Sequence, residues 1–124
     1  MLKIFLIIST LIWLPYGLFC FFFPDWVSVL NGVQPANETG LIEFKAIYGG
    51  LQSGMGLLAL YALQNSRVER PALLMFLFLC GSMGLGRFIA CDFSGHVTFY
   101  TYMATILELG TAVFAFWLLG DAQD

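Results

Sequence analysis

The feature that most constrains this chain is a series of four long apolar runs, separated by short segments rich in turn-forming residues. The runs cover residues 2–23, 41–63, 71–91 and 98–119. A helix rises about 1.5 Å per residue, so about 20 apolar residues cross the roughly 30 Å hydrocarbon core of a bilayer. The sequence therefore predicts an all-α protein in which one domain, residues 1–124, forms a four-helix transmembrane bundle.

The composition supports a lipid environment. Of the 124 residues, 60% are hydrophobic and only 10% are charged. A soluble domain usually carries about 25% charged residues to cover its surface. The net charge of −3 leaves no basic stripe of the kind that binds nucleic acid. Membrane lipids are the partners that we expect.

The first run is expected to remain as a helix of the mature protein. Lys3 followed by apolar residues resembles the start of a signal peptide, but the run continues to Phe23 and no small-x-small cleavage site follows it. Pro15 lies inside the run and is expected to kink the helix.

The connections between the runs are short. Trp26 to Leu30 is interpreted as a short interfacial helix, with Trp26 as an anchor at the level of the headgroups. Pro71 suits the first turn of the third helix, and the segment 92–97 is expected to turn the chain into the fourth.

Basic residues near the helix ends predict the orientation. Four spans place both termini and the 64–70 loop on one side, which holds Lys3, Arg67 and Arg70. The opposite loops hold no Lys or Arg, so the positive-inside rule predicts that both termini lie in the cytoplasm of a bacterial inner-membrane protein.

The start of the second run carries a carboxylate above several glycines. In a regular α-helix, Glu43, Ile47, Gly50 and Gly54 share one face. The spacing Gly50-x-x-x-Gly54 admits a neighbouring helix at close range. Glu43 is then expected to point at that neighbour and away from lipid.

Four charges lie within the apolar runs: Glu43, Lys45, Arg87 and Glu108. All fall in the outer half of the predicted bundle, and Glu108 lies about 15 Å from the outer end of its helix. An ionised carboxylate at that depth costs at least a few kcal/mol unless it is paired, hydrated or protonated. Because two acids and two bases sum to zero, we expect a charge-balanced cluster between the second, third and fourth helices.

Several uncharged residues are expected to complete this cluster. Thr101 and Thr105 precede Glu108 at helical spacing and form a small, polar stripe on an otherwise apolar helix. The expected ligand or ion pocket consists of Glu43, Lys45, Tyr48, Arg87, Thr101, Thr105 and Glu108, with Asp92 and His96 at its outer rim.

The cluster has two interpretations. It either fixes the register of the helices without binding anything, or it lines a pocket that is open to the outer side. Buried ion pairs add little stability, and ionisable groups at membrane depth are functional by default, so the second interpretation is favoured.

No residues with the spacing of a catalytic, metal or cofactor site are apparent. A single histidine, and cysteines 20, 80 and 91 without a C-x-x-C pair, disfavour a transition-metal site and structural disulfides. The three thiols are expected to be free and buried. We expect no metal, no cofactor and no catalytic group.

One combination of motifs resembles a known family. Glu43-x-Lys45-Ala46-x-Tyr48-Gly49-Gly50 opens the second helix, Gly86-Arg87 lies in the third, and Glu108 lies in the fourth. An Asp-x-x-Gly turn runs from Asp92 to Gly95. The combination is similar to an uncharacterised bacterial family of small four-helix membrane proteins, known only as a domain of unknown function. Its second-helix motif is usually E-x-R-A-x-Y-G-G, and the lysine found here offers a point charge in place of a bidentate contact. The resemblance implies the fold and no activity.

The expected function is non-enzymatic binding of a lipid-like ligand, or of a partner protein, by an accessory membrane protein. One alternative is a small transporter or channel that uses Glu108 to exchange a proton or cation. A second alternative is a membrane enzyme on a lipid-like substrate, with Glu108 as acid or base. Because so short a chain buries little in its own core, a homo-oligomer or a subunit of a membrane complex is expected.

Overall fold

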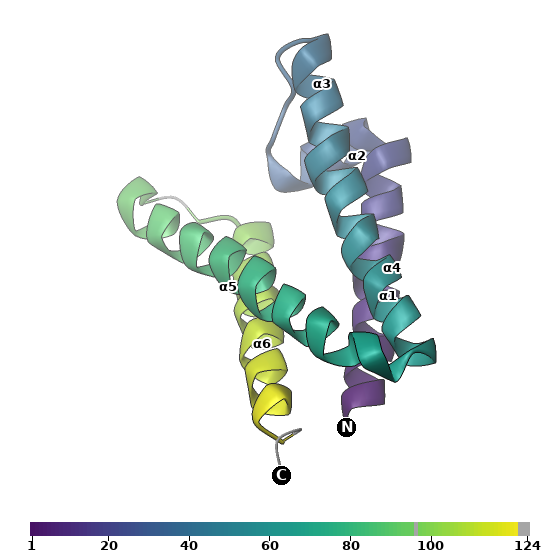
Figure 1. Ribbon diagram of the computed structural model, residues 1–124. Coiled ribbons are helices and arrows are strands. Elements are labelled where there is room, and N and C mark those ends of the chain that lie inside the picture. Colours follow the sequence, from purple (N-terminus) through teal and green to yellow (C-terminus); the bar gives the residue numbers. More distant parts are fainter. Residues whose placement is uncertain (96, 122–124) are drawn as a thin grey trace. The chain divides into compact units, whose positions relative to one another are not determined.

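The chain is built from helices. The computed structural model describes residues 1–95 and 97–121, and only the backbone of Ser94. Every regular element in these residues is a helix, which confirms the all-α prediction (Figure 1). The chain divides into two compact units, Met1–Ser66 (unit 1) and Arg67–Asp124 (unit 2). The prediction of one four-span domain stays a prediction.

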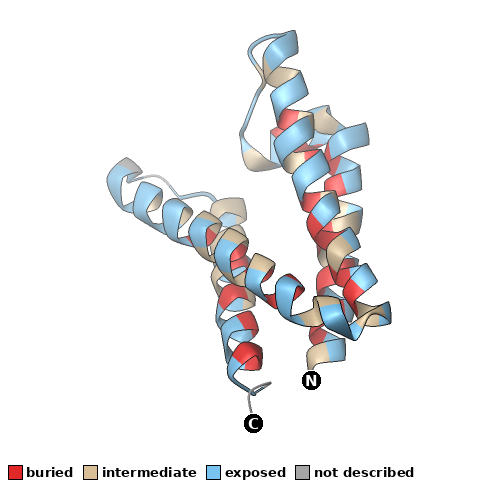
Figure 2. Ribbon diagram, in the orientation of Figure 1, coloured by how far each residue is buried: buried red, intermediate tan, exposed pale blue. Residues whose placement is uncertain are grey.

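Unit 1 pairs one long helix with a second that contains a π-helical segment. The first helix is α1 (Leu2–Phe22), with Pro15 inside it. The short α2 (Pro24–Asn31) follows at once. The second long helix runs without a break through α3 (Glu38–Phe44), the π-helix η1 (Lys45–Leu51) and α4 (Gln52–Gln64). Buried residues lie along the contact between α1 and this helix (Figure 2).

The second long helix begins three residues before the predicted start, because a side chain caps it. The side-chain oxygen of Asn37 accepts a hydrogen bond from the backbone N–H of Gly40, at 2.9 Å. This bond satisfies one of the N–H groups that the first turn of a helix leaves free. The apolar run starts only at Leu41, so hydrophobicity alone misses the polar first turn.

Close packing in unit 1 depends on glycines that face α1. A Cβ on Gly56 would overlap the backbone of Leu14, and a Cβ on Gly49 would lie 2.8 Å from the Cβ of Phe21. Gly54 has no neighbouring atom within 4 Å at its Cβ position. Gly50 and Gly54 therefore do not admit α1, and the face predicted for close packing is exposed within unit 1.

Unit 2 is an antiparallel pair of helices. After the 3₁₀ turn η2 (Ser66–Val68), α5 (Glu69–Ser94) and α6 (Phe99–Asp121) pack against each other. The turn predicted to start at Asp92 is wrong in its position, because α5 continues through this residue. Gly95, with a left-handed φ of 66°, ends the helix.

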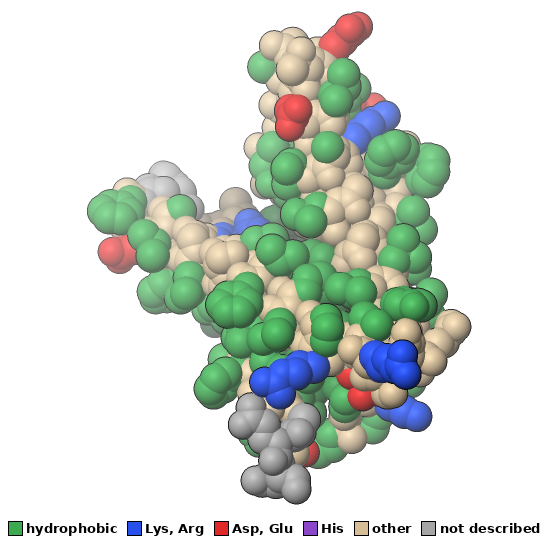
Figure 3. All heavy atoms as spheres, viewed as in Figure 1, with side chains coloured by type: hydrophobic (Ala, Val, Ile, Leu, Met, Phe, Trp, Pro, Cys, Tyr) green, Lys and Arg blue, Asp and Glu red, His purple; other side chains and the backbone are tan. Residues whose placement is uncertain are grey.

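In the part of the chain that the structure describes, four helices are long and apolar enough to cross a membrane: Leu2–Phe22, Glu38–Gln64, Ser66–Phe93 and Phe99–Asp121. Apolar side chains cover much of the visible face of these helices (Figure 3). The chain thus fits an integral, multi-pass membrane protein. The cytoplasmic placement of the termini and the bacterial inner membrane stay predictions.

Candidate functional site

The candidate site is built on the contact between α5 and α6. The two backbones approach closely at Gly84, where a Cβ would lie 2.8 Å from the Leu109 side chain and 3.1 Å from its backbone nitrogen. Arg87 lies three residues after Gly84, and Glu108 directly precedes Leu109. The close approach therefore brings these two long side chains opposite each other.

Arg87 and Glu108 form an ion pair with two hydrogen bonds. The Nη2 of Arg87 donates to Oε1 of Glu108 at 2.8 Å, and its Nε donates to Oε2 at 3.1 Å. This is the forked geometry in which guanidinium binds carboxylate most firmly. The Glu108 side chain is only 5% exposed, whereas that of Arg87 is 27% exposed. The carboxylate is thus enclosed, and the guanidinium keeps access to the surroundings.

The threonines before Glu108 bond mainly within their own helix. Thr105 Oγ1 donates to the carbonyl oxygen of Thr101 at 2.8 Å. Thr98 Oγ1 accepts from the backbone N–H of Thr101 at 3.2 Å and caps the first turn of α6. A hydroxyl keeps acceptor capacity after it has donated, so Thr105 can still accept a hydrogen bond.

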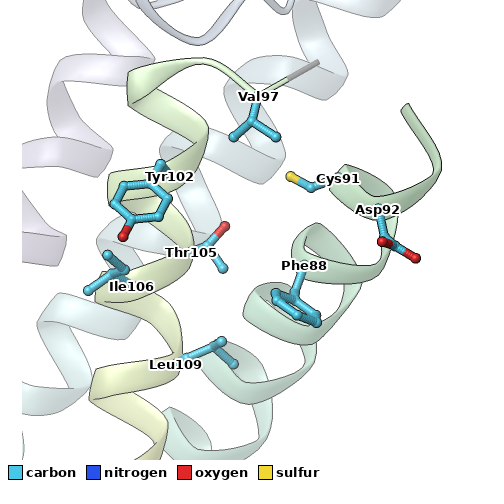
Figure 4. A pocket seen from close by; sticks show the side chains of 8 residues that line it. All are labelled: Phe88, Cys91, Asp92, Val97, Tyr102, Thr105, Ile106 and Leu109. Carbon is cyan, nitrogen blue, oxygen red and sulfur yellow. The ribbon is translucent and has the colours of Figure 1, made fainter. Parts of the chain in front are cut away.

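An apolar pocket (the α5–α6 pocket) lies on the same two helices, with a volume of about 470 Å³. It is lined by Phe88, Cys91, Asp92, Val97, Tyr102, Thr105, Ile106 and Leu109. The sulfur of Cys91 and the hydroxyl of Thr105 point into the space between the helices (Figure 4). Cys91 lies four residues after Arg87, and Thr105 lies three residues before Glu108, so each shares a helix face with one member of the ion pair. The ion pair itself is not part of the lining and lies about one helical turn from it.

Two of the predicted site residues take part in the lining of this pocket, Asp92 and Thr105. Thr101 is not among the lining residues and acts through its backbone carbonyl, which Thr105 uses. His96 lies outside the described residues. The sequence reasoning missed Phe88, Cys91, Val97, Tyr102, Ile106 and Leu109. Their signal was a spacing of three or four residues among themselves, at 88 and 91 on α5 and at 102, 106 and 109 on α6, but apolar residues at that spacing are ordinary in a membrane helix.

The other predicted site residues belong to unit 1. Glu43 is exposed near the start of the second long helix. The ammonium of Lys45 lies 5.6 Å from the ring centroid of Phe21, and Tyr48 stacks on Phe44 with the centroids 4.7 Å apart. A meeting of Glu43 with Arg87 and Glu108 therefore stays a prediction.

Unit 1 also has a smaller apolar pocket, of about 240 Å³, lined in part by Glu43, Phe44, Ile47 and Tyr48. These residues flank or lie in the π-helix, which bonds from residue i to i+5 and is seen mostly as short segments, frequently at functional sites. The wider turn shifts all later residues by part of a turn. Glu43 thus loses the alignment with Gly54 that α-helical spacing predicts.

The described residues offer little for metal chemistry. Within 1–95 and 97–121, no three His, Cys, Asp or Glu side chains come together as a possible metal site. Cys20 and Cys80 are free and buried. Cys91 is only half-buried, because it borders the α5–α6 pocket.

A family model described as a domain of unknown function, DUF4345, matches residues 1–119. The chain belongs to this family. Membership confirms the resemblance to an uncharacterised family, and it brings no activity with it. The motif and the bacterial source inferred from the sequence stay predictions. No curated protein and no solved structure matches the chain.

Proposed function

We propose that this protein is a non-enzymatic binding or accessory protein of the bacterial inner membrane, and that it holds a lipid-like amphiphile in the α5–α6 pocket. One observation carries the proposal: an apolar pocket of about 470 Å³ lies about one helical turn from an ion pair with an enclosed carboxylate, on two helices fit to cross a membrane. Pockets for small molecules usually measure about 300–1,000 Å³ and are mostly apolar with a few polar groups.

The lining favours a hydrocarbon chain over a headgroup. Phe88, Val97, Ile106 and Leu109 supply apolar surface. The Thr105 hydroxyl already donates a hydrogen bond to the carbonyl oxygen of Thr101, so it can only accept a hydrogen bond from a ligand. A flexible acyl or isoprenoid chain fits the apolar part of this lining.

The ion pair supports this role by keeping its charges away from the ligand. Each charge satisfies the other through two hydrogen bonds. Arg87 or Glu108 without its partner would favour water over a hydrocarbon chain between the helices, whereas Asp92, the charged residue of the lining, lies near the end of α5. The pair also joins α5 to α6 along the pocket, which keeps the space between the helices open at a defined width.

The predicted orientation places the pocket on the outer side of the membrane. With both termini in the cytoplasm, the α5–α6 connection lies outside, and Val97 at this end borders the pocket. A lipid of the outer leaflet would then enter from the side, between the two helices.

The test is lipid retention, measured by native mass spectrometry of the full chain purified from its membrane in mild detergent. Ile106→Trp fills the pocket, and Val113→Trp is the control. The two positions are exposed, and they lie seven residues apart on one face of α6, but only Ile106 lines the pocket. We expect the wild type and Val113→Trp to retain a lipid, and Ile106→Trp to lose most of it. Absence of retained lipid in the wild type, or equal retention in both variants, would contradict the proposal.

A further inference from the structure

The short helix α2 exposes several large apolar side chains. Its buried face carries Val27 and Ser28, with Asn31 half-buried beside them. Its exposed face carries Trp26, Val29 and Leu30, which are 71%, 77% and 63% exposed, together with the carboxylate of Asp25 in the first turn. A surface helix in water turns its polar residues outward and its apolar residues inward. The exposed face of α2 therefore fits a boundary between an apolar medium, which takes the three large side chains, and water, which takes the carboxylate of Asp25.

The inner face of α2 is fixed to the long helices of unit 1. Val27 packs in a buried cluster with Cys20 and Phe44, and Tyr16 and Tyr48 pack against it. This cluster holds the rotation of α2 about its own axis. The exposed apolar face is thus a fixed feature of the fold.

The position of α2 in the chain identifies the medium. It begins at Pro24, directly after the span candidate Leu2–Phe22, and the next candidate begins at Glu38. A helix that joins the ends of two spans lies at a boundary between hydrocarbon and water. Trp is enriched at this level, because its ring is apolar and its N–H prefers a polar partner.

From these observations we infer that α2 is an interfacial helix, with Trp26, Val29 and Leu30 inserted among the lipids of the leaflet in which α1 ends. Such helices bury their apolar face about 5–10 Å into the boundary between headgroups and acyl chains. Residues 24–40 contain no Lys or Arg, so the insertion depends on apolar contact and not on anionic lipids. A stable contact with a second protein needs about 1,000 Å² or more, which exceeds the face of an eight-residue helix.

The test is the depth of Trp26, measured by fluorescence quenching in vesicles of brominated phosphatidylcholine. Trp13 and Trp117 also emit, so the signal of Trp26 is the difference between the wild type and Trp26→Phe. We expect strong quenching by bromine on the upper part of the acyl chain and weaker quenching by bromine near its end. We expect no change when anionic lipid is added, and little quenching by aqueous iodide.

Three results would overturn the inference. Quenching by iodide but not by brominated lipid would place α2 in water. Quenching strongest near the chain ends would place it deep in the bilayer. Protection from both quenchers would show that protein covers the face. Trp26 is exposed and outside the buried cluster, so Trp26→Phe is expected to fold, and circular dichroism of both proteins checks this.

Discussion

Arg87 on α5 and Glu108 on α6 face each other across a helix contact and share two hydrogen bonds, although 21 residues separate them in the chain. The burial of the pair is unequal. Glu108 is enclosed, and Arg87 retains 27% of its side-chain exposure. Removal of either partner thus leaves the other in a different environment.

This asymmetry predicts that replacing Arg87 or Glu108 by uncharged glutamine lowers the free energy of unfolding by different amounts. Arg87→Gln leaves a carboxylate enclosed without its cation and is expected to lower the free energy of unfolding by about 3 kcal/mol. Glu108→Gln leaves Arg87 without its anion, but the long arginine side chain can reach polar surroundings. We therefore expect a smaller loss of unfolding free energy, about 1–2 kcal/mol. Denaturant unfolding in one detergent–lipid mixture measures both. Asp121→Asn, an exposed charge on the same helix, is the control and should change little. An equal loss of unfolding free energy in the two variants, or a larger loss for Glu108→Gln, would contradict the prediction that the carboxylate is the more confined group.

A second prediction concerns the close approach of α5 and α6 at Gly84. Gly84→Ala places a methyl group against Leu109 and is expected to destabilise the protein by about 1–3 kcal/mol. Gly86→Ala, two residues further, has open space at its Cβ position. Because alanine has a higher helix propensity than glycine, this control variant should be as stable as the wild type or more stable by up to about 1 kcal/mol. Thermal unfolding compares the two, and similar losses would argue against the observed helix contact.

The third prediction separates the two glycine faces of the second long helix. A methyl group at Gly56 meets the backbone of Leu14, which cannot move aside as a side chain can. Gly56→Ala is therefore expected to cost more than Gly84→Ala, about 3 kcal/mol or more. Gly54→Ala should be tolerated, because no atom lies near it. The same unfolding assay applies. A large loss for Gly54→Ala in a bilayer would show that the face of Gly50 and Gly54 is occupied there.

A fourth prediction distinguishes binding from transport. Because Glu108 is engaged with Arg87 through both carboxylate oxygens, we expect it not to exchange protons or cations during a transport cycle. Proteoliposomes with a pH-sensitive dye inside should show the proton leak of empty liposomes. A flux that disappears in Glu108→Gln would support the transporter alternative.

Long apolar runs predicted the helices of this protein well, because about 20 apolar residues have few options other than a membrane helix. The helix ends were less predictable, since they depend on single side chains. Asn37 caps the second long helix before its apolar run begins, and α5 continues past Asp92 until Gly95 ends it. Asn37 as a cap that starts a helix and Gly95 as a residue that ends one were both visible in the sequence, but hydropathy does not take them into account.

The helix faces were harder to predict than the helices. The second long helix has glycines on two faces, and spacing alone did not show that α1 packs against Gly49 and Gly56. The π-helical segment was also missed, because the choice between i→i+4 and i→i+5 bonding depends on packing against α1. Threonine spacing suggested a polar stripe directed at a neighbouring helix. Thr105 instead donates its hydrogen bond to the Thr101 carbonyl oxygen within α6.

The most direct test of the proposed site is solid-state NMR of the isotopically labelled full chain in lipid bilayers. It measures the separation of the Arg87 guanidinium nitrogens from the Glu108 carboxyl carbon, and magnetisation transfer from lipid acyl chains to Cys91 and Thr105. We expect an Arg87–Glu108 separation that fits the 2.8 Å nitrogen–oxygen contact, with strong acyl-chain transfer to both pocket residues. A separation too long for an ion pair, or transfer from water in place of acyl chains, would contradict a lipid-binding pocket beside a paired charge.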